Sequence, residues 1–298
     1  MALKKSLTGI IIASSAAICF AANTTASPIA ANGGSSVLTY LVLRSTIATL
    51  VIFILLLITR SNIKLCPRRR WMALGVGIIM AIHSFALLSA IQYIPIALAV
   101  LIFYTFPILT TLYLWSIGRE RANWLASTAL FLGLAGLALA LNIGNSELDI
   151  LGIGLAVISA IGITIVIIIN SQLVGKGDSR PVTLHMLISA SIVFILLTTM
   201  LGDFHLPNTV TGWWAISSGP LFYAFAIISL FIAIAILGPI KASMTMNLEP
   251  VSSILLGFLI LNQSLTNQQI LGSAIVIISI LLIQQSNKKK NINKGDQN

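Results

Sequence analysis

The sequence contains few of the side chains from which soluble catalytic sites are built. Charged residues make up only 8% of its 298 positions, and it has three histidines and two cysteines, Cys19 and Cys66. Two distant cysteines and three scattered histidines provide neither a disulfide framework nor a metal cluster. The phosphate-loop pattern G-x-x-x-x-G-K-[ST] and the zinc pattern H-E-x-x-H are also missing. We therefore expect no cofactor, no metal ion, no ATP hydrolysis by this chain and no enzymatic activity.

Apolar sequence, by contrast, is abundant. Hydrophobic residues account for 57% of the chain, and the mean hydropathy is +1.02. A helix needs about 20 apolar residues to cross a hydrocarbon core of about 30 Å, and in lipid each span has to pair its own backbone polar groups. We therefore predict an all-α membrane protein with ten transmembrane helices. The expected segments are residues 7–26, 37–59, 71–91, 96–115, 124–141, 150–169, 182–201, 213–237, 240–261 and 267–283.

The positive charges alternate with these segments. Of 17 Lys and Arg residues, all except Arg44 and Lys241 lie in the N-terminus, in the second, fourth and sixth connections, or in the tail. Lysine and arginine favour the cytoplasmic side of a membrane. We therefore predict a multi-pass protein of the bacterial inner membrane with both termini in the cytoplasm. The net charge of +10 then reflects topology and indicates no nucleic-acid partner, and Lys241 is expected to anchor its segment at the interface.

The first 27 residues allow two interpretations. Lys4 and Lys5 precede an apolar run over residues 10–22, and small residues follow at Ala26 and Ser27. This order is typical of a cleaved signal peptide, and it also fits an uncleaved first helix. We favour the helix, because the internal repeat described next needs a first segment as the partner of the sixth.

The two halves of the chain resemble each other. The matching pairs are Gly9 and Gly152, Pro95 and Pro239, Pro107 and Pro250, and Glu120 and Gln263. Each half contains five predicted segments, and an odd number means that the second copy enters the membrane with the opposite orientation. Inverted repeats of this kind build secondary transporters, with the substrate site between the copies near the midplane. We assign the first repeat to residues 1–146, the second to residues 147–285, and a disordered, basic cytoplasmic tail to residues 286–298.

These residues also carry a family resemblance. The motifs are Tyr93-Ile94-Pro95, Thr105-Phe106-Pro107 with Glu120, and Leu248-Glu249-Pro250-Val251. The sequence resembles the EamA-type permeases of the drug/metabolite transporter superfamily over its whole length. The resemblance implies a ten-helix bundle that moves small organic metabolites, with a cavity lined by the first, third, fourth, sixth, eighth and ninth helices. Two positions depart from the family pattern: Gln263 stands where Glu is usual, and Ala129 where Gly is common.

Glu249 is the strongest candidate site residue. It lies nine residues after Ile240, which places it about 13 Å into its segment. An acid at this depth costs a few kcal/mol and usually faces a cavity or a partner. Pro250 removes a backbone hydrogen bond at the carbonyl of Met246, which can open that segment to a ligand. A cation or proton site and a purely structural carboxyl both remain open.

Arg44 and His83 are further candidates within predicted segments. Arg44 offers a bidentate donor for a carboxylate or phosphate, but it can instead pair with Glu249 or extend to the interface. The resemblance puts the second helix at the periphery, which favours such a structural role for Arg44. His83 lies in the third helix, where a ligand contact and a satisfied buried histidine are equally compatible with the sequence.

The other predicted substrate contacts are uncharged. Tyr104 and Tyr223 offer hydroxyls and ring faces, with ordinary core packing as the alternative. Asn23 in the first segment and Asn247 beside Glu249 are weaker candidates of the same kind.

Together these residues predict a permease that exports or exchanges small amino-acid-like or amphipathic metabolites by alternating access. We expect a monomer or homodimer in the bilayer. Two alternatives are a flippase-like translocator of lipid-linked substrates and an accessory subunit of a membrane assembly. A flippase predicts a lateral opening with an elongated apolar groove, whereas a permease predicts a closed central vestibule.

Overall fold

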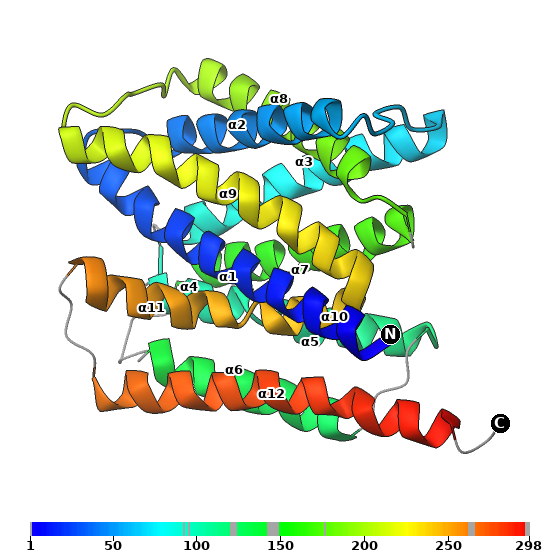
Figure 1. Ribbon diagram of the computed structural model, residues 1–298. Coiled ribbons are helices and arrows are strands. Elements are labelled where there is room, and N and C mark those ends of the chain that lie inside the picture. The colour runs from blue at the N-terminus through cyan, green and yellow to red at the C-terminus, as the bar shows by residue number, and fades with distance from the viewer. Residues whose placement is uncertain are drawn as a thin grey trace.

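The computed structural model describes residues 2–91, 93–94, 96–119, 124–141, 149–175, 177–261 and 266–295. Every regular element within these ranges is a helix (Figure 1). The helices are α1 (Ala2–Asn32), α2 (Val37–Ile58), α3 (Pro67–Ala90), α4 (Ile96–Phe103), α5 (Phe106–Ser116), α6 (Trp124–Leu141), α7 (Ile150–Val174), α8 (Arg180–Leu201), α9 (Val210–Leu237), α10 (Pro239–Thr245), α11 (Leu248–Leu261) and α12 (Asn267–Gly295).

Several helices begin at a capping side chain that the sequence supplies. Ser36 accepts a hydrogen bond from the N–H of Thr39 at the start of α2, and Thr209 accepts one from Gly212 at the start of α9. Asp149 accepts two N–H groups in the first turn of α7. These caps satisfy N–H groups that the first helical turn leaves unpaired. They fix where three of the long apolar helices start.

Two of the predicted segments are each divided into two helices. A turn at Tyr104 and Thr105 separates α4 from α5, and a turn at Met246 and Asn247 separates α10 from α11. A proline follows each turn, in the first helical turn of α5 and of α11. Proline lacks an N–H and cannot complete the hydrogen-bond ladder there. The two breaks therefore lie at corresponding positions of the two halves of the chain.

The packing partners in the two halves also correspond. Helix α1 of the first half packs along α9 of the second half, and correspondingly α7 of the second half packs along α3 of the first half. Gly9 of α1 lies against Leu237 at the end of α9, and Gly152 of α7 lies against Tyr93 and Ile94 just after the end of α3. Likewise α3 packs on α8 as α9 packs on α2. The glycine pair recognised in the sequence therefore marks equivalent contacts.

The helices α6 and α12 form a separate layer below the others in Figure 1. They cross where Gly272 meets the backbone of Gly136 and Ala140 so closely that a side chain on Gly272 has no room. Small residues at such crossings allow close helix approach in membranes.

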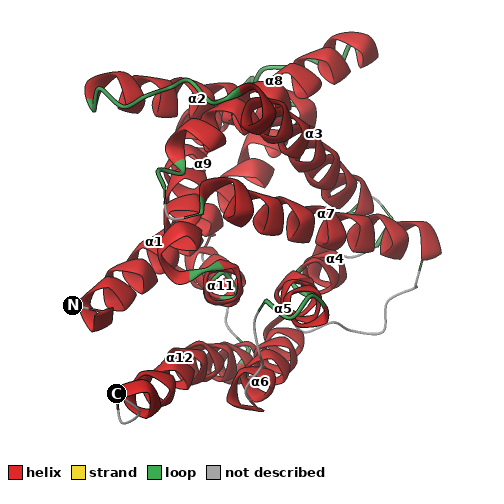
Figure 2. Ribbon diagram, turned by 90° about the vertical axis from the view of Figure 1, so that its right-hand side faces the viewer, coloured by secondary structure: helices red, strands yellow, loops and turns green. Residues whose placement is uncertain are grey.

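The two ends of the bundle differ in charge. In Figure 1 both chain termini and the α2–α3 and α7–α8 connections lie on the right, while the α8–α9 connection lies on the left. The basic residues of the α2–α3 connection therefore gather at the end that also carries the N-terminus. Figure 2 views the bundle from that end, with α2, α8 and α3 on one side and α6 and α12 on the other.

In the part of the chain that the structure describes, eight helical stretches are long and apolar enough to cross a membrane. One of them, Leu98–Ser116, runs through the α4–α5 break. The other two predicted segments coincide with the divided α10–α11 pair and with the shorter apolar stretch Asn267–Leu282, so the count of ten transmembrane helices stays a prediction. One expectation needs correction: α12 continues to Gly295, through most of the tail predicted to be disordered. Lysine and glutamine are good helix formers, and residues 284–294 contain neither proline nor glycine.

Candidate functional site

The candidate site is centred on Glu249, in the first turn of α11 just after the α10–α11 break. The helix begins at Leu248, so the carboxylate lies at the end where unpaired N–H groups favour negative charge. Thr24 of α1 donates a hydrogen bond from Oγ1 to Glu249 Oε1 at 3.1 Å. Glu249 is only partly buried and the Thr24 side chain is exposed. The carboxyl group of Glu249 is therefore reachable from the surface of the protein.

Tyr104, in the α4–α5 break, lies beside Glu249. Its hydroxyl is buried and interacts with the carboxyl group of Glu249. The ring packs edge-on against Phe103 with ring centroids 5.4 Å apart. Phe103 in turn stacks on His83 of α3 at 6.3 Å. The two broken helices thus bring a carboxylate and an aromatic cluster to the same place.

Arg44 reaches this region from α2. Its Nη2 donates a hydrogen bond to Ser84 Oγ at 3.2 Å, and its guanidinium lies 4.4 Å from the ring centroid of Tyr223. A guanidinium over a tyrosine face is a cation–π contact. Arg44 is close enough to Glu249 for electrostatic attraction, yet no ion pair joins these two described side chains. The second helix, α2, packs on both α8 and α9, and the role of Arg44 stays a prediction.

The contacts close into a circuit that we call the central ring. Tyr223 packs edge-on against Phe20 at 5.8 Å, and Phe20 lies one turn before Thr24 on α1, which leads back to Glu249. In order, the central ring consists of Glu249, Tyr104, Phe103, His83, Ser84, Arg44, Tyr223, Phe20 and Thr24. Its members come from α1, α2, α3, α4, the α4–α5 break, α9 and α11. It combines one cation, one anion and four aromatic rings.

Comparison with known proteins shows which family the sequence matches. The EamA-like transporter family matches the sequence twice, over residues 7–142 and 150–285. The chain belongs to the EamA-like transporter family. A curated relative, the uncharacterized transporter sll1319 of Synechocystis sp., is 25% identical over 220 residues, which cover 72% of this chain and 66% of that protein. A solved crystal structure shares the fold, with a TM-score of 0.71 at 16% identity over 92% of this chain and 97% of the other.

Membership in the EamA-like family makes the chain a multi-pass membrane permease, and it points to a transporter rather than an enzyme. Among the residues that carried the resemblance, Glu249 lies in the central ring, and the Thr105-Phe106-Pro107 motif spans the α4–α5 break. The motif residues Pro95, Glu120 and Gln263 lie outside the described residues.

Five of the predicted site residues of this EamA-like chain belong to the central ring: Glu249, His83, Tyr104, Tyr223 and Arg44. The two asparagines do not. Asn23 is buried and accepts a hydrogen bond from Tyr40 Oη at 3.0 Å, which joins α1 to α2. Asn247 is buried near Gly133 of α6 and Ser279 of α12, on the side of the break away from α1.

Four members of the central ring were missed from the sequence: Phe20, Thr24, Ser84 and Phe103. Phe20 and Thr24 are four residues apart and therefore share one face of α1. That spacing was readable in a helix expected to line the cavity. Ser84 and Phe103 each adjoin a predicted residue, but a serine and a phenylalanine in apolar helices carry no signal of their own.

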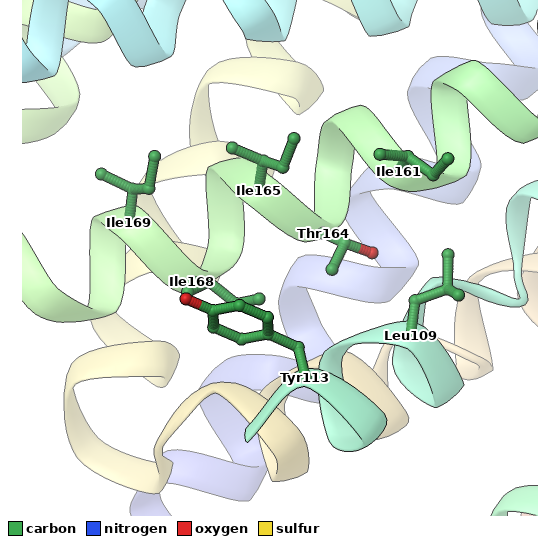
Figure 3. A pocket seen from close by; sticks show the side chains of 7 residues that line it. All are labelled: Leu109, Tyr113, Ile161, Thr164, Ile165, Ile168 and Ile169. Carbon is green, nitrogen blue, oxygen red and sulfur yellow. The ribbon is translucent and has the colours of Figure 1, made fainter. Parts of the chain in front are cut away.

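A second feature lies on the outside of the bundle. A groove of about 330 Å³ between α5 and α7 is lined by Leu109, Tyr113, Ile161, Thr164, Ile165, Ile168 and Ile169. Figure 3 shows Thr164 and Ile168 of α7 on the side of Leu109 and Tyr113 of α5. Its lining is almost wholly apolar, and none of these residues belongs to the central ring.

Proposed function

We propose that the protein is a secondary permease of the bacterial inner membrane that exports or exchanges small amino-acid-like or amphipathic metabolites. The observation that carries the proposal is the position of Glu249 opposite Arg44 in the central ring, between two broken helices. Broken helices with their ends at mid-membrane are the usual way that transporters expose backbone and charge to a substrate. Among the residues that the structure describes, neither charge makes a direct contact with a side chain of opposite sign, which supports a role of both charges in binding a ligand.

Alternating access is the mechanism that this architecture favours. The corresponding contacts of α1 with α9 and of α7 with α3 support two inverted five-helix repeats, related by a pseudo-two-fold axis in the membrane plane. Moving one repeat against the other opens the shared site first to one side and then to the other. We place both termini in the cytoplasm, because the basic connections gather at the end of the bundle that carries them.

The test is solute uptake into proteoliposomes that contain the purified protein. A screen across amino acids, amines, nucleosides and sugars should find solutes whose uptake exceeds that of empty liposomes. Glu249→Gln should reduce this uptake while expression and thermal stability stay close to wild type. Arg70→Gln provides a matched control, because it removes one exposed charge from the first turn of α3 and leaves the central ring intact. If no solute moves, or if Glu249→Gln transports normally, the proposal is wrong.

The groove between α5 and α7 favours a second candidate function, the flippase-like translocation of a lipid-linked substrate. An apolar groove of this kind accommodates an acyl chain while a polar head group enters the bundle. Replacing Ile165 by Trp should fill the groove, and the variant then distinguishes lipid flipping from transport of a water-soluble solute. Flipping of a fluorescent lipid should then stop, whereas transport of a water-soluble solute through the central ring should continue.

A further inference from the structure

We propose that Arg180 is a releasable latch that holds α2 against α8 at the end of the bundle that carries both termini, while the opposite end of the same helix pair stays tied through its backbone. The inference goes beyond the substrate site, and it rests on the proposed alternating access for its role in transport. It is carried by the hydrogen bonds at the two ends of the helix pair, by the repeat that relates those ends, and by the difference in their chemistry.

Helices α2 and α8 pack against each other along a contact that we call the α2–α8 seam. Thr49 Oγ1 and Ser191 Oγ lie 3.2 Å apart within it. Further along α2, Thr59 contacts Arg180 at the start of α8, so the two helices run in opposite directions. Leu187 lies between Arg180 and Ser191 on the same face of α8 and is fully buried. Arg180 therefore stands at one end of a packed, largely apolar seam.

Arg180 joins the two helices at this end through its guanidinium. Its Nη1 donates a hydrogen bond to Thr59 Oγ1 at 3.0 Å, and its Nη2 donates one to Ser61 Oγ at 2.8 Å. Asp178 holds the guanidinium in this orientation, with Oδ2 at 2.7 Å from Nη2. The side chains of Arg180 and Asp178 are 22% and 37% exposed, so water competes for the same groups. A rotation of one side chain is enough to break this contact.

The other end of the α2–α8 seam is joined through the backbone. The N–H of Ser36 at the start of α2 donates to the carbonyl of His205 at 3.1 Å, and the N–H of Asn208 donates to the carbonyl of Gly33 at 2.7 Å. Ser36 Oγ also donates to the carbonyl of Asp203 at 2.8 Å. A partly exposed side chain changes rotamer far faster than a connection rearranges its backbone. This end therefore holds while the end with Arg180 opens.

The repeat makes the two ends of the seam equivalent positions. The offset between the paired glycines of α1 and α7 also pairs Ser36 with Ser179, and these two serines are the N-cap residues of α2 and α8. The same offset pairs Arg180 with Val37, which has no polar side chain. Equivalent ends thus carry different chemistry. The end with Arg180, which we place in the cytoplasm, is the one that opens, and the backbone-tied end is the pivot.

Thiol labelling at two matched positions of α8 measures which end opens, without any need for transport. Thr183 lies near Arg180 and Thr198 lies towards the backbone-tied end, and they are 1% and 3% exposed. Each is replaced by cysteine in a chain with Cys19→Ser and Cys66→Ser, and the protein in nanodiscs is treated with N-ethylmaleimide. Arg180→Gln should accelerate labelling of Thr183→Cys about tenfold, because loss of a hydrogen bond to a charged group shifts an opening equilibrium by about that factor. Labelling of Thr198→Cys should keep its rate.

Two further variants separate the bridge from the charge. Thr59→Val combined with Ser61→Ala removes both acceptors and keeps the ion pair of Arg180, and it should accelerate labelling of Thr183→Cys as Arg180→Gln does. Arg70→Gln removes one exposed positive charge from the first turn of α3 and should leave both labelling rates unchanged. Size-exclusion chromatography and thermal unfolding establish that each variant is folded.

Cross-linking tests the role of the latch in transport. In the same background without the native cysteines, Thr59→Cys and Arg180→Cys are joined by a bifunctional methanethiosulfonate, which ties the latch end of the seam shut. Ser36→Cys and His205→Cys are joined in the same way at the other end. The first link should abolish uptake of a transported solute into proteoliposomes until a reductant cleaves it. The second link should leave most of the uptake.

The outcomes distinguish the latch from the transport function. Unchanged labelling of Thr183→Cys in either latch variant, or equal acceleration of Thr183→Cys and Thr198→Cys, overturns the latch and leaves the permease standing. Uptake that survives the link between positions 59 and 180 also overturns it. If no solute of any class moves, the transport function itself fails, whatever the labelling shows. Faster labelling at the latch end alone, together with loss of uptake on its cross-link, supports the latch.

Discussion

Tyr40 on α2 donates its hydroxyl to Asn23 on α1, at 3.0 Å from both the backbone oxygen and the side-chain oxygen of that residue. The hydroxyl occupies the space left by the missing side chain of Gly219 on α9. Three helices therefore meet at one buried hydrogen-bonded contact. This contact accounts for Asn23 as a structural residue, where the sequence alone allowed a substrate contact.

Gly219→Ala should destabilise the protein, because the new methyl group collides with the Tyr40 hydroxyl and displaces it from Asn23. A buried interhelical hydrogen bond in a membrane protein contributes about 1 kcal/mol, and the collision adds to its loss. Thermal unfolding in detergent should show a lower midpoint than wild type. Gly154→Ala on α7 is the matched control, since a side chain there meets nothing within 4 Å. Equal midpoints for the two variants would contradict this account of the contact.

Gly272→Ala should weaken the packing of α6 against α12. The Cβ atom would meet the backbone of Ala140 and Gly136, and backbone cannot move aside as a flexible side chain can. We expect a loss of about 1–3 kcal/mol, which is typical of overpacking. Cysteine cross-linking between the two helices reports the same change, with slower reaction in the variant. Gly154→Ala serves again as the control.

The predicted topology can be tested with fusions to a reporter that is active only in the periplasm. Fusions after Asn145 and Pro207 should be active, and fusions after Asn62 and Asn291 should be silent. The reason is the segregation of Lys and Arg to one end of the bundle. The reversed pattern would invert the assigned orientation.

The α7–α8 connection provides a prediction about pH. Hydrogen bonds from the Arg180 side chain hold the pKa of Asp178 below its ordinary value, and the same guanidinium donates to Ser61 after the end of α2 at 2.8 Å. A carboxyl with a lowered pKa in the folded state stabilises the protein above its unfolded-state pKa of about 3.9, and this contribution disappears as the pH falls below that value.

Asp178→Asn should therefore lower the midpoint of thermal unfolding slightly at pH 7, by an amount that corresponds to less than about 1 kcal/mol for an exposed pair. The difference from wild type should vanish near pH 3. A difference that is the same at both pH values would show that Asp178 acts through packing and not through its charge.

The architecture was largely predictable, because hydropathy and the alternation of basic connections depend only on local sequence. The segments and their order came from apolar runs, and Pro250 indicated the helix break before α11, whereas the corresponding break before α5 was not predicted. The site was harder to predict. Glu249 stood out because an acid in the middle of an apolar segment is rare. Thr24 contacts Glu249, and Phe20 contacts Tyr223, only because α1 packs against α9 and α11. Arg44 was expected on a peripheral helix, and its contacts with Ser84 of α3 and Tyr223 of α9 depend on packing that the sequence does not show.

The matching of Pro107 with Pro250 places Phe106 and Glu249 at the same position of the two repeats. If the halves were identical, the states open to either side of the membrane would be related by the pseudo-two-fold axis and would have equal free energy. An apolar ring at one position and a carboxylate at the other are one difference that removes this equality, as are Glu120 and Gln263. Under alternating access, the unloaded protein would therefore have a preferred resting side. The repeat would supply the movement, and differences such as Phe106 against Glu249 would set the direction in which the empty carrier is biased.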